Sequence, residues 1–283
     1  MQPGKRSQMA VGTALFRAAH QLLDEDPKIL ADPLALPILG ADPKDVEANR
    51  ERHSKPYLIK ARTLAVMRSR YTDDELAASI ERGVTQYVVL GAGLDTSPYR
   101  PGHVAEKLQT FEIDHPDTQQ WKLERLRAAK IRTRENVRHV PIDFERQSLG
   151  EGLEQNGFDR NQPAFFSWLG VIYYLQRESG LETFRYIAAL PAGSQVVLDF
   201  MLDDTSLDET RRESVRKASD YVASIGEPWL TRYAPDDLEQ TLHDIGFSET
   251  TFFSNDLATE RYLKGRSDGL SLDSLIQMMS AIV

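Results

Sequence analysis

The stretch that most constrains this chain is a short apolar run that ends abruptly at two glycines. Gln86 to Leu90 is rich in β-branched residues, and Gly91-Ala92-Gly93 follows at once. Such a run predicts a strand buried in a parallel sheet. Glycine lets the backbone turn sharply and approach a ligand closely, because it carries no Cβ. The pattern favours an open α/β sheet, with either a nucleotide crevice or a tight turn without a ligand after this strand.

Acidic residues follow the next two expected strands. Asp114 comes directly after residues 109–113, at about the twenty-residue offset from which a carboxylate reaches ribose hydroxyls. A carboxylate suits a diol because it accepts both O–H donors at once. Residues 137–142 form a third expected strand, and Asp143 and Phe144 follow it. We expect Asp143 to accept a hydrogen bond from an adenine amino group and Phe144 to pack on the adenine ring.

These features weigh against a nicotinamide-dependent oxidoreductase, which is the obvious alternative for a glycine bend of this kind. The dinucleotide fingerprint carries a third glycine, but Thr96 occupies that position here. Two acids at successive strand ends also exceed what that fingerprint requires. The oxidoreductase is therefore the less favoured class.

The combination resembles a class I S-adenosylmethionine-dependent methyltransferase, and more narrowly the family of leucine carboxyl methyltransferases and polyketide O-methyltransferases. The segments that carry the likeness are VVLGAGLDTSPYR (88–100), FEIDHP (111–116), VPIDF (140–144) and FFSWLGVIYYL (165–175). Flanking matches are Arg62-Thr63, DPLA (32–35) and GEPW (226–229). The resemblance covers roughly Thr13 to Arg266. It implies a doubly wound, Rossmann-like α/β fold whose mostly parallel sheet has seven strands, preceded by an N-terminal helical cap.

The resemblance also implies S-adenosylmethionine as the cofactor and a set of residues that bind it. In the family, the arginine of the Arg-Thr pair grips the carboxylate of the methionine part, which suits a guanidinium fork. From spacing alone, Arg62 could equally be a surface arginine, and His115 a structural hydrogen-bond donor. The implied cofactor-binding set is Arg62, Gly91, Ala92, Gly93, Asp95, Asp114, His115, Asp143, Phe144, Ser167 and Trp168.

The sequence departs from the family after the fourth expected strand. Many relatives carry a glutamate where this chain has Leu169, and that acid holds the amino group of the cofactor. We expect a backbone carbonyl near Ser167 or Trp168 to take the ammonium instead, with Asp95 nearby, since a carbonyl is an adequate acceptor. The loss of the glutamate also leaves open a non-catalytic protein that binds the cofactor and transfers nothing.

Tyr173 and Tyr174 follow this strand and are the candidate catalytic residues. They could contact the substrate or act as a weak base, although an unperturbed tyrosine pKa of about 10 makes the latter demanding. They could also be two aromatic wall residues. The six histidines show no ligand spacing, so we expect no metal. The resemblance implies an O-methyltransferase that acts on a small-molecule carboxylate or hydroxyl, and it suggests secondary metabolism.

Composition limits the partners and the location. A net charge of −9 over 283 residues argues against a general nucleic-acid binder. No apolar stretch approaches the ~20 residues that span a bilayer. Because the chain also lacks cysteine, we expect a cytoplasmic protein. The sequence leaves the oligomeric state open.

We expect a single domain over residues 1–283, with a cap at 1–70, a Rossmann-like core at 71–283 and a lid insertion around 203–230. The pattern predicts helices at 11–23, 55–70, 73–82, 205–225 and 235–245, with Thr72 as the N-cap of the third. It predicts later strands at 163–168, 195–200, 248–253 and 256–263, followed by a docked helix over 270–283.

Overall fold

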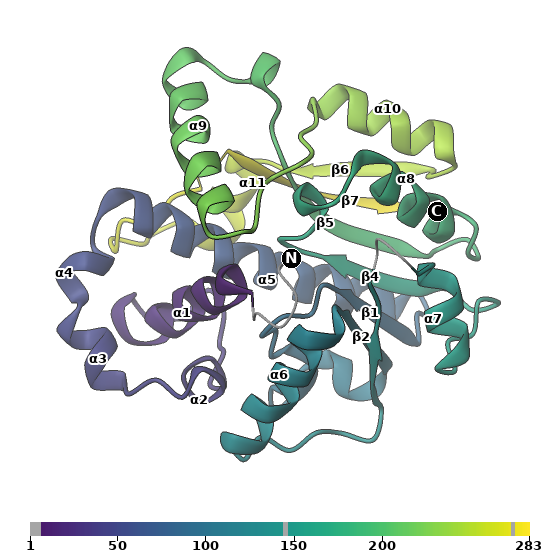
Figure 1. The fold of residues 1–283 in the computed structure, drawn as a ribbon, viewed down its shortest axis with the longest axis horizontal. Coiled ribbons are helices and arrows are strands. Elements are labelled where there is room, and N and C mark those ends of the chain that lie inside the picture. Colours follow the sequence, from purple (N-terminus) through teal and green to yellow (C-terminus); the bar gives the residue numbers. More distant parts are fainter. Residues whose placement is uncertain (1–6, 144–146, 273–274) are drawn as a thin grey trace.

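The computed structural model describes residues 7–143, 147–272 and 275–283, and its centre is one seven-stranded sheet (Figure 1). The strands are β1 (Gln86–Leu90), β2 (Gln109–Asp114), β3 (Val137–Pro141), β4 (Ala164–Trp168), β5 (Gln195–Met201), β6 (Glu249–Phe253) and β7 (Ile276–Ile282). Their order is β3-β2-β1-β4-β5-β7-β6, and β7 runs antiparallel to both neighbours. The predicted doubly wound, mostly parallel α/β class is confirmed.

Helices pack on both faces of this sheet. They are α1 (Gln8–Leu23), α2 (Ala35–Leu39), α3 (Pro43–Ala48), α4 (Arg50–His53), α5 (Pro56–Glu81), α6 (Pro116–Ala128), α7 (Leu149–Gln155), α8 (Arg177–Ala188), α9 (Glu209–Ser224), α10 (Pro235–Ile245) and α11 (Asn255–Ala258). One core joins α7, α8 and α10 to one face of the strands, and a second joins α5 and α11 to the other. Alternate residues of β1, β4 and β5 enter opposite cores, which is why these strands read as largely apolar runs.

The last two predicted elements are wrong. Asp256 to Leu263, expected as a strand, forms α11 and one π-helical turn. Residues 270–283, expected as a docked helix, contain β7. The inner residues of β7 are buried because the strand lies between β5 and β6. A short apolar run does not distinguish a buried strand from a buried helix, so this assignment needed the sheet.

The two helices expected around residue 70 are one continuous helix, α5. Thr72 is therefore not an N-cap. It lies inside the helix, where it is buried against the sheet-facing core. Asp73 and Asp74 continue the helical turn, and the chain leaves the helix only at Arg82.

The N-terminal helices gather at one side of the sheet, beside α9 (Figure 1). Helix α1 packs on α5 and α2 through buried alanines, and its other face looks onto the end of β1. The cap and lid divisions of the chain stay predictions. Among the described residues, no helix combines the length and the apolar character that crossing a membrane requires.

Candidate functional site

A cavity of about 640 Å³ lies at the carboxyl ends of β1 to β4, where an open α/β sheet places its ligands. Its walls come from α1, α5, the glycine bend, the ends of β2 and β3, the start of α6, the turn after β4, and residues 226–228 and 230. The predicted site residues that line it are Gly91, Ala92, Gly93, Asp95, Asp114, His115, Asp143, Tyr173 and Tyr174. Three others, Arg62, Ser167 and Trp168, do not line it, and Phe144 lies outside the described residues.

The two glycines of the bend leave little room for a Cβ. Gly91 has φ +70°, and a Cβ there would lie 2.2 Å from Cγ2 of Val171 in the turn after β4. Gly93 has φ +42°, and its Cβ would lie 3.2 Å from the Cβ of Ala10 in α1. Both the positive φ and the close approach favour glycine. The bend therefore brings bare backbone to the cavity wall.

Asp114 is held at the end of β2 by two backbone donors. Its Oδ2 accepts a hydrogen bond from the Gly93 amide at 2.5 Å, and its Oδ1 accepts one from the His115 amide at 2.7 Å. Burial raises the pKa of Asp114 to about 6, although these two hydrogen bonds oppose the change. Asp114 is therefore mostly ionised at neutral pH, and each oxygen keeps a lone pair for a further donor. The side chain fits a ribose diol.

Asp95 is a second ionised carboxylate of the cavity wall. Its Oδ1 accepts from the Ser97 amide at 2.6 Å. Burial would raise its pKa, but the charges of Arg17 and Lys122 hold the pKa of Asp95 below its usual value. Arg17 also lines the cavity and is paired with Asp32, with Nε donating to Oδ2 at 2.9 Å. Asp95 is thus a negatively charged group of the site, and the charge of the neighbouring Arg17 is balanced by Asp32.

His115 and Asp143 occupy the ends of β2 and β3. Nδ1 of His115 accepts from the Asp117 amide at 3.3 Å and so caps helix α6. His115 therefore has a structural role as a hydrogen-bond acceptor, not as the donor that the sequence suggested, in addition to its place in the cavity wall. The backbone amide of Asp143 donates to Oε1 of Gln147 at 3.1 Å.

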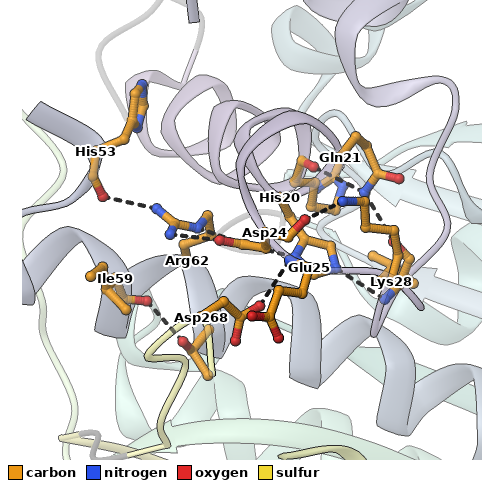
Figure 2. Close-up of polar contacts among 12 residues, drawn as sticks. His20, Gln21, Asp24, Glu25, Lys28, His53, Ile59, Arg62 and Asp268 are labelled. Carbon is orange, nitrogen blue, oxygen red and sulfur yellow. Dashed lines mark hydrogen bonds and ion pairs between the residues drawn. The ribbon is translucent and has the colours of Figure 1, made fainter. Parts of the chain in front are cut away.

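Arg62 is committed elsewhere, and the expected contact with the cofactor carboxylate is not supported (Figure 2). Its Nε and Nη2 donate to the two oxygens of Asp24 at 2.9 and 2.8 Å, and its Nη1 donates to the carbonyl of His53 at 2.9 Å. Asp24 also pairs with His20, whose Nδ1 lies 2.7 Å from Oδ2. This buried cluster ties α1 to α5 outside the cavity. Arg62 thus uses three N–H donors on Asp24 and His53, and it does not line the cavity.

Arg68 is the cavity arginine that the sequence reasoning missed. It lies six residues further along α5, lines the cavity, and is 8% exposed. Nη1 donates to Oδ2 of Asp199 at 2.8 Å, and Nη2 donates to Oγ1 of Thr13 at 3.3 Å. Burial alone would lower the pKa of Arg68, but the Asp199 carboxylate raises it above its usual value. The Arg68 side chain is thus a fixed cation at the wall.

Ser167 and Trp168, the expected carbonyl acceptors at the end of β4, come before the point at which the chain reaches the cavity. Ser167 is buried within the sheet, where its Oγ lies 2.9 Å from the hydroxyl of Tyr87. Trp168 is fully buried and packs edge-on against Phe184, with ring centroids 5.1 Å apart. The cavity instead meets the chain at Leu169 and the residues after it. Ser167 and Trp168 therefore shape the core beneath the site.

Tyr173 and Tyr174 line the cavity as protonated phenols. Burial, reinforced by the charge of Asp199, raises the pKa of Tyr173 well above 10. Burial raises the pKa of Tyr174 to about 12. Both can donate hydrogen bonds at neutral pH, and neither is poised to remove a proton. The role as a weak base is not supported, whereas substrate contact is compatible with their position.

Glu227 closes one side of the cavity. Its Oε2 accepts from the hydroxyl of Ser7 at 3.0 Å, and its Oε1 accepts from the Gln8 amide at 2.7 Å. The carboxylate thus sits on the first turn of α1, where a helix favours negative charge. Across the described ranges, no group of three or more histidine, aspartate or glutamate side chains is placed to hold a metal ion.

Comparison with known proteins agrees with this geometry. The family model for leucine carboxyl methyltransferase matches residues 10–188. The protein named "Putative S-adenosyl-L-methionine-dependent methyltransferase YktD" of Bacillus subtilis (strain 168) is 31% identical over 216 residues, which cover 76% of this chain and 71% of that protein. A protein of Mycolicibacterium paratuberculosis (strain ATCC BAA-968 / K-10), named in the same way without a gene name, is 30% identical over 209 residues, covering 70% and 67%.

Solved structures share the fold. A structure titled as a putative methyltransferase from Thermobifida fusca YX aligns with a TM-score of 0.59 and 17% identity, covering 99% of this chain and 96% of that one. A DUF574 family protein from Streptomyces avermitilis MA-4680 aligns with a TM-score of 0.54 and 14% identity, covering 95% and 96%. Together with the family match, the glycine bend and the acidic strand end, this leads to one conclusion: the chain belongs to the leucine carboxyl methyltransferase family and is an S-adenosylmethionine-dependent methyltransferase.

Proposed function

We propose that this methyltransferase acts on an oxygen atom of a small-molecule acceptor, a carboxylate or an acidic hydroxyl. S-adenosylmethionine supplies the methyl group when it is bound. The single observation that carries the cofactor site of this proposal is the half-buried carboxylate of Asp114, joined to the Gly93 amide in the wall of the cavity. It offers an ionised acceptor beside bare backbone, which is what an adenosyl group requires.

Four side chains would hold the cofactor. Asp114 accepts from the ribose diol, and Asp143 accepts from the adenine amino group. Arg68 replaces Arg62 as the partner of the methionine carboxylate, because it is the arginine of α5 that lines the cavity. Asp95 accepts from the ammonium group, since its depressed pKa keeps it ionised in the wall and Leu169 offers no carboxylate.

The acceptor would lie beside Tyr173 and Tyr174. Methyl transfer from a sulfonium needs alignment and exclusion of water more than it needs side-chain chemistry. Two protonated phenols can orient an oxygen by donating to it, but they cannot deprotonate it at neutral pH. This supports an acceptor oxygen that is already ionised, or nearly so, in solution.

The test is a product assay on the purified protein. Samples with S-adenosylmethionine and a panel of carboxylic acids, phenols, aliphatic alcohols and amines are analysed for S-adenosylhomocysteine and for methylated product by mass spectrometry. We expect methyl esters or aryl methyl ethers and no methylated amine. Methylation at nitrogen would reject the oxygen assignment, and methylation of aliphatic alcohols alone would reject the acidic acceptor.

A binding protein without turnover is the second candidate, and Leu169 is the observation that favours it. Leu169 lines the cavity where many relatives carry an acid for the ammonium group. Binding of S-adenosylhomocysteine without turnover of any acceptor would support this candidate. Restoring the acid with Leu169→Glu is the matched variant, and it should then raise cofactor affinity.

A cytoplasmic location and a role in secondary metabolism belong to the same proposal. The resemblance and the lack of cysteine support them. Fractionation of cells that express the tagged chain tests the location. Comparison of small-molecule extracts from cells with and without the active protein tests the metabolic role, because a methylated metabolite should disappear with the activity.

A further inference from the structure

Asp199 is a fully buried carboxylate that the proposed function does not use. It lies in β5, it is 0% exposed, and it does not line the cavity. Its partner Arg68 does line the cavity. Burying such a pair is costly, and apolar residues of similar volume often serve stability as well or better. The position of Asp199 therefore invites an explanation other than stability.

The two oxygens of Asp199 hold two parts of the cavity wall at once. Oδ2 accepts from Nη1 of Arg68 at 2.8 Å, and Oδ1 accepts from the Gly170 amide at 2.5 Å. Gly170 has φ +74°, and a Cβ there would lie 3.0 Å from Nη1 of Arg68. The carboxylate thus locks the arginine of α5 against the turn that follows β4.

Arg68 is held on further sides. Nη2 donates to Thr13 of α1 at 3.3 Å, and Arg68 interacts electrostatically with the neighbouring Tyr173. Within the described residues, these contacts use only part of the guanidinium, which carries more N–H donors. The remaining donors stay available to a ligand in a direction set by Asp199. Fixing a charged group before the ligand arrives removes an ordering cost from binding.

We propose that Asp199 is a positioning residue: it orients Arg68 toward the amino-acid carboxylate of S-adenosylmethionine. The inference rests on the proposed role of Arg68. Asp199 touches no ligand and acts through Arg68 and Gly170. Its effect is confined to ligands that carry the carboxylate, because the adenosine part is held by other strand ends.

The test compares two ligands that share the adenosine part and the thioether sulfur but differ in the amino-acid part. S-adenosylhomocysteine carries the carboxylate and the ammonium group, and 5′-methylthioadenosine lacks both. Their dissociation constants are measured by calorimetry for the wild type, for Asp199→Asn and for Asp73→Asn. Asp73 is the matched control, because it is an acid paired with an arginine, Arg100, at 2.8 Å, and neither residue lines the cavity.

We expect Asp199→Asn to weaken S-adenosylhomocysteine binding by about tenfold or more, the range of a charged hydrogen bond, and to change 5′-methylthioadenosine binding by less than about twofold. Asp73→Asn should leave the ratio of the two affinities unchanged. Equal losses for both ligands in Asp199→Asn would reduce Asp199 to a structural residue. Failure of the wild type to bind either ligand would instead reject the proposed cofactor site.

A second measurement uses the wild type and covers the case in which Asp199→Asn does not fold. Nitrogen NMR of the arginine side chains reports rotation of the guanidinium, with the Arg68 signals assigned by their loss in Arg68→Lys. We expect slow rotation, with separate Nη signals, in the ligand-free protein. Averaged signals that separate only when S-adenosylhomocysteine is added would show that Arg68 is not positioned before the ligand binds, which would overturn the proposal.

Discussion

Cofactor affinity should depend on pH through Asp114, because burial raises the pKa of this carboxyl to about 6. The ribose diol donates two hydrogen bonds and needs the ionised form, which can accept both. Above its pKa Asp114 is ready to bind; below it, a proton must first be lost. The affinity should therefore fall as the pH falls through about 6, the opposite of what a protonated acceptor would give.

The size of the effect follows from the fraction that is ionised. With a pKa of about 6, about one molecule in eleven has an ionised Asp114 at about pH 5. The dissociation constant of S-adenosylhomocysteine should therefore rise about tenfold between about pH 7.5 and 5. Isothermal titration calorimetry over this range measures it directly, and buffers of different ionisation enthalpy report the proton that the protein releases on binding.

Asp114→Asn is the variant that isolates the residue. It should weaken binding at about pH 7.5 by about 10- to 100-fold, the range for hydrogen bonds to a charged group, and remove most of the pH dependence. His115 also lines the cavity, and Asp114→Asn tests whether the pH dependence comes from Asp114 or from this neighbour. A flat profile in the wild type would refute the reasoning, as would a slope that survives in Asp114→Asn.

Three further predictions follow from the contacts at the cavity. Arg68→Lys should weaken S-adenosylhomocysteine binding about tenfold. Arg62→Lys should instead lower the unfolding free energy by roughly 3 kcal/mol and leave the affinity unchanged. Calorimetry measures the affinity and urea denaturation measures the stability, and the reverse pattern would restore Arg62 to the site. Gly91→Ala should abolish cofactor binding and lower the melting temperature, because the new Cβ has no space. Gly102→Ala is the control: Gly102 has a similar φ of +72° and nothing within 4 Å of the new Cβ, so this change should cost only the backbone strain of roughly 1 kcal/mol. Equal effects of the two variants would contradict the steric argument. Glu227→Gln should speed amide hydrogen exchange in the first turn of α1 about fivefold or more, and unchanged exchange would show that the carboxylate does not hold that turn.

The α/β core could be predicted from local sequence because its strands are buried on both faces. Apolar runs with β-branched residues, each ended by a glycine or an acid, identify β1 and β2 without knowledge of their neighbours. The glycine bend was equally legible, since a positive φ at Gly91 and Gly93 needs glycine whatever surrounds it. The same local signals identified Asp114, which follows its strand directly.

The arginine of α5 could not be chosen in this way. Arg62 and Arg68 are six residues apart in one helix, so their side chains point about 120° apart around its axis. Which of them meets the cavity depends on how α5 is rotated against the sheet. That rotation is set by the packing of its buried face, and no single residue near either arginine reports it.

By itself, the sequence determined the parallel strands of the sheet, the bend and the acid that suits a ribose, because each depends on the backbone conformation or on the period of a single segment. Only the tertiary structure decided that residues 270–283 supply a strand, that Arg68 rather than Arg62 faces the cavity, and that Asp199 stands behind it. These outcomes depend on contacts between segments far apart in the chain. Arg68 and Asp199 are separated by 131 positions, yet they meet at 2.8 Å.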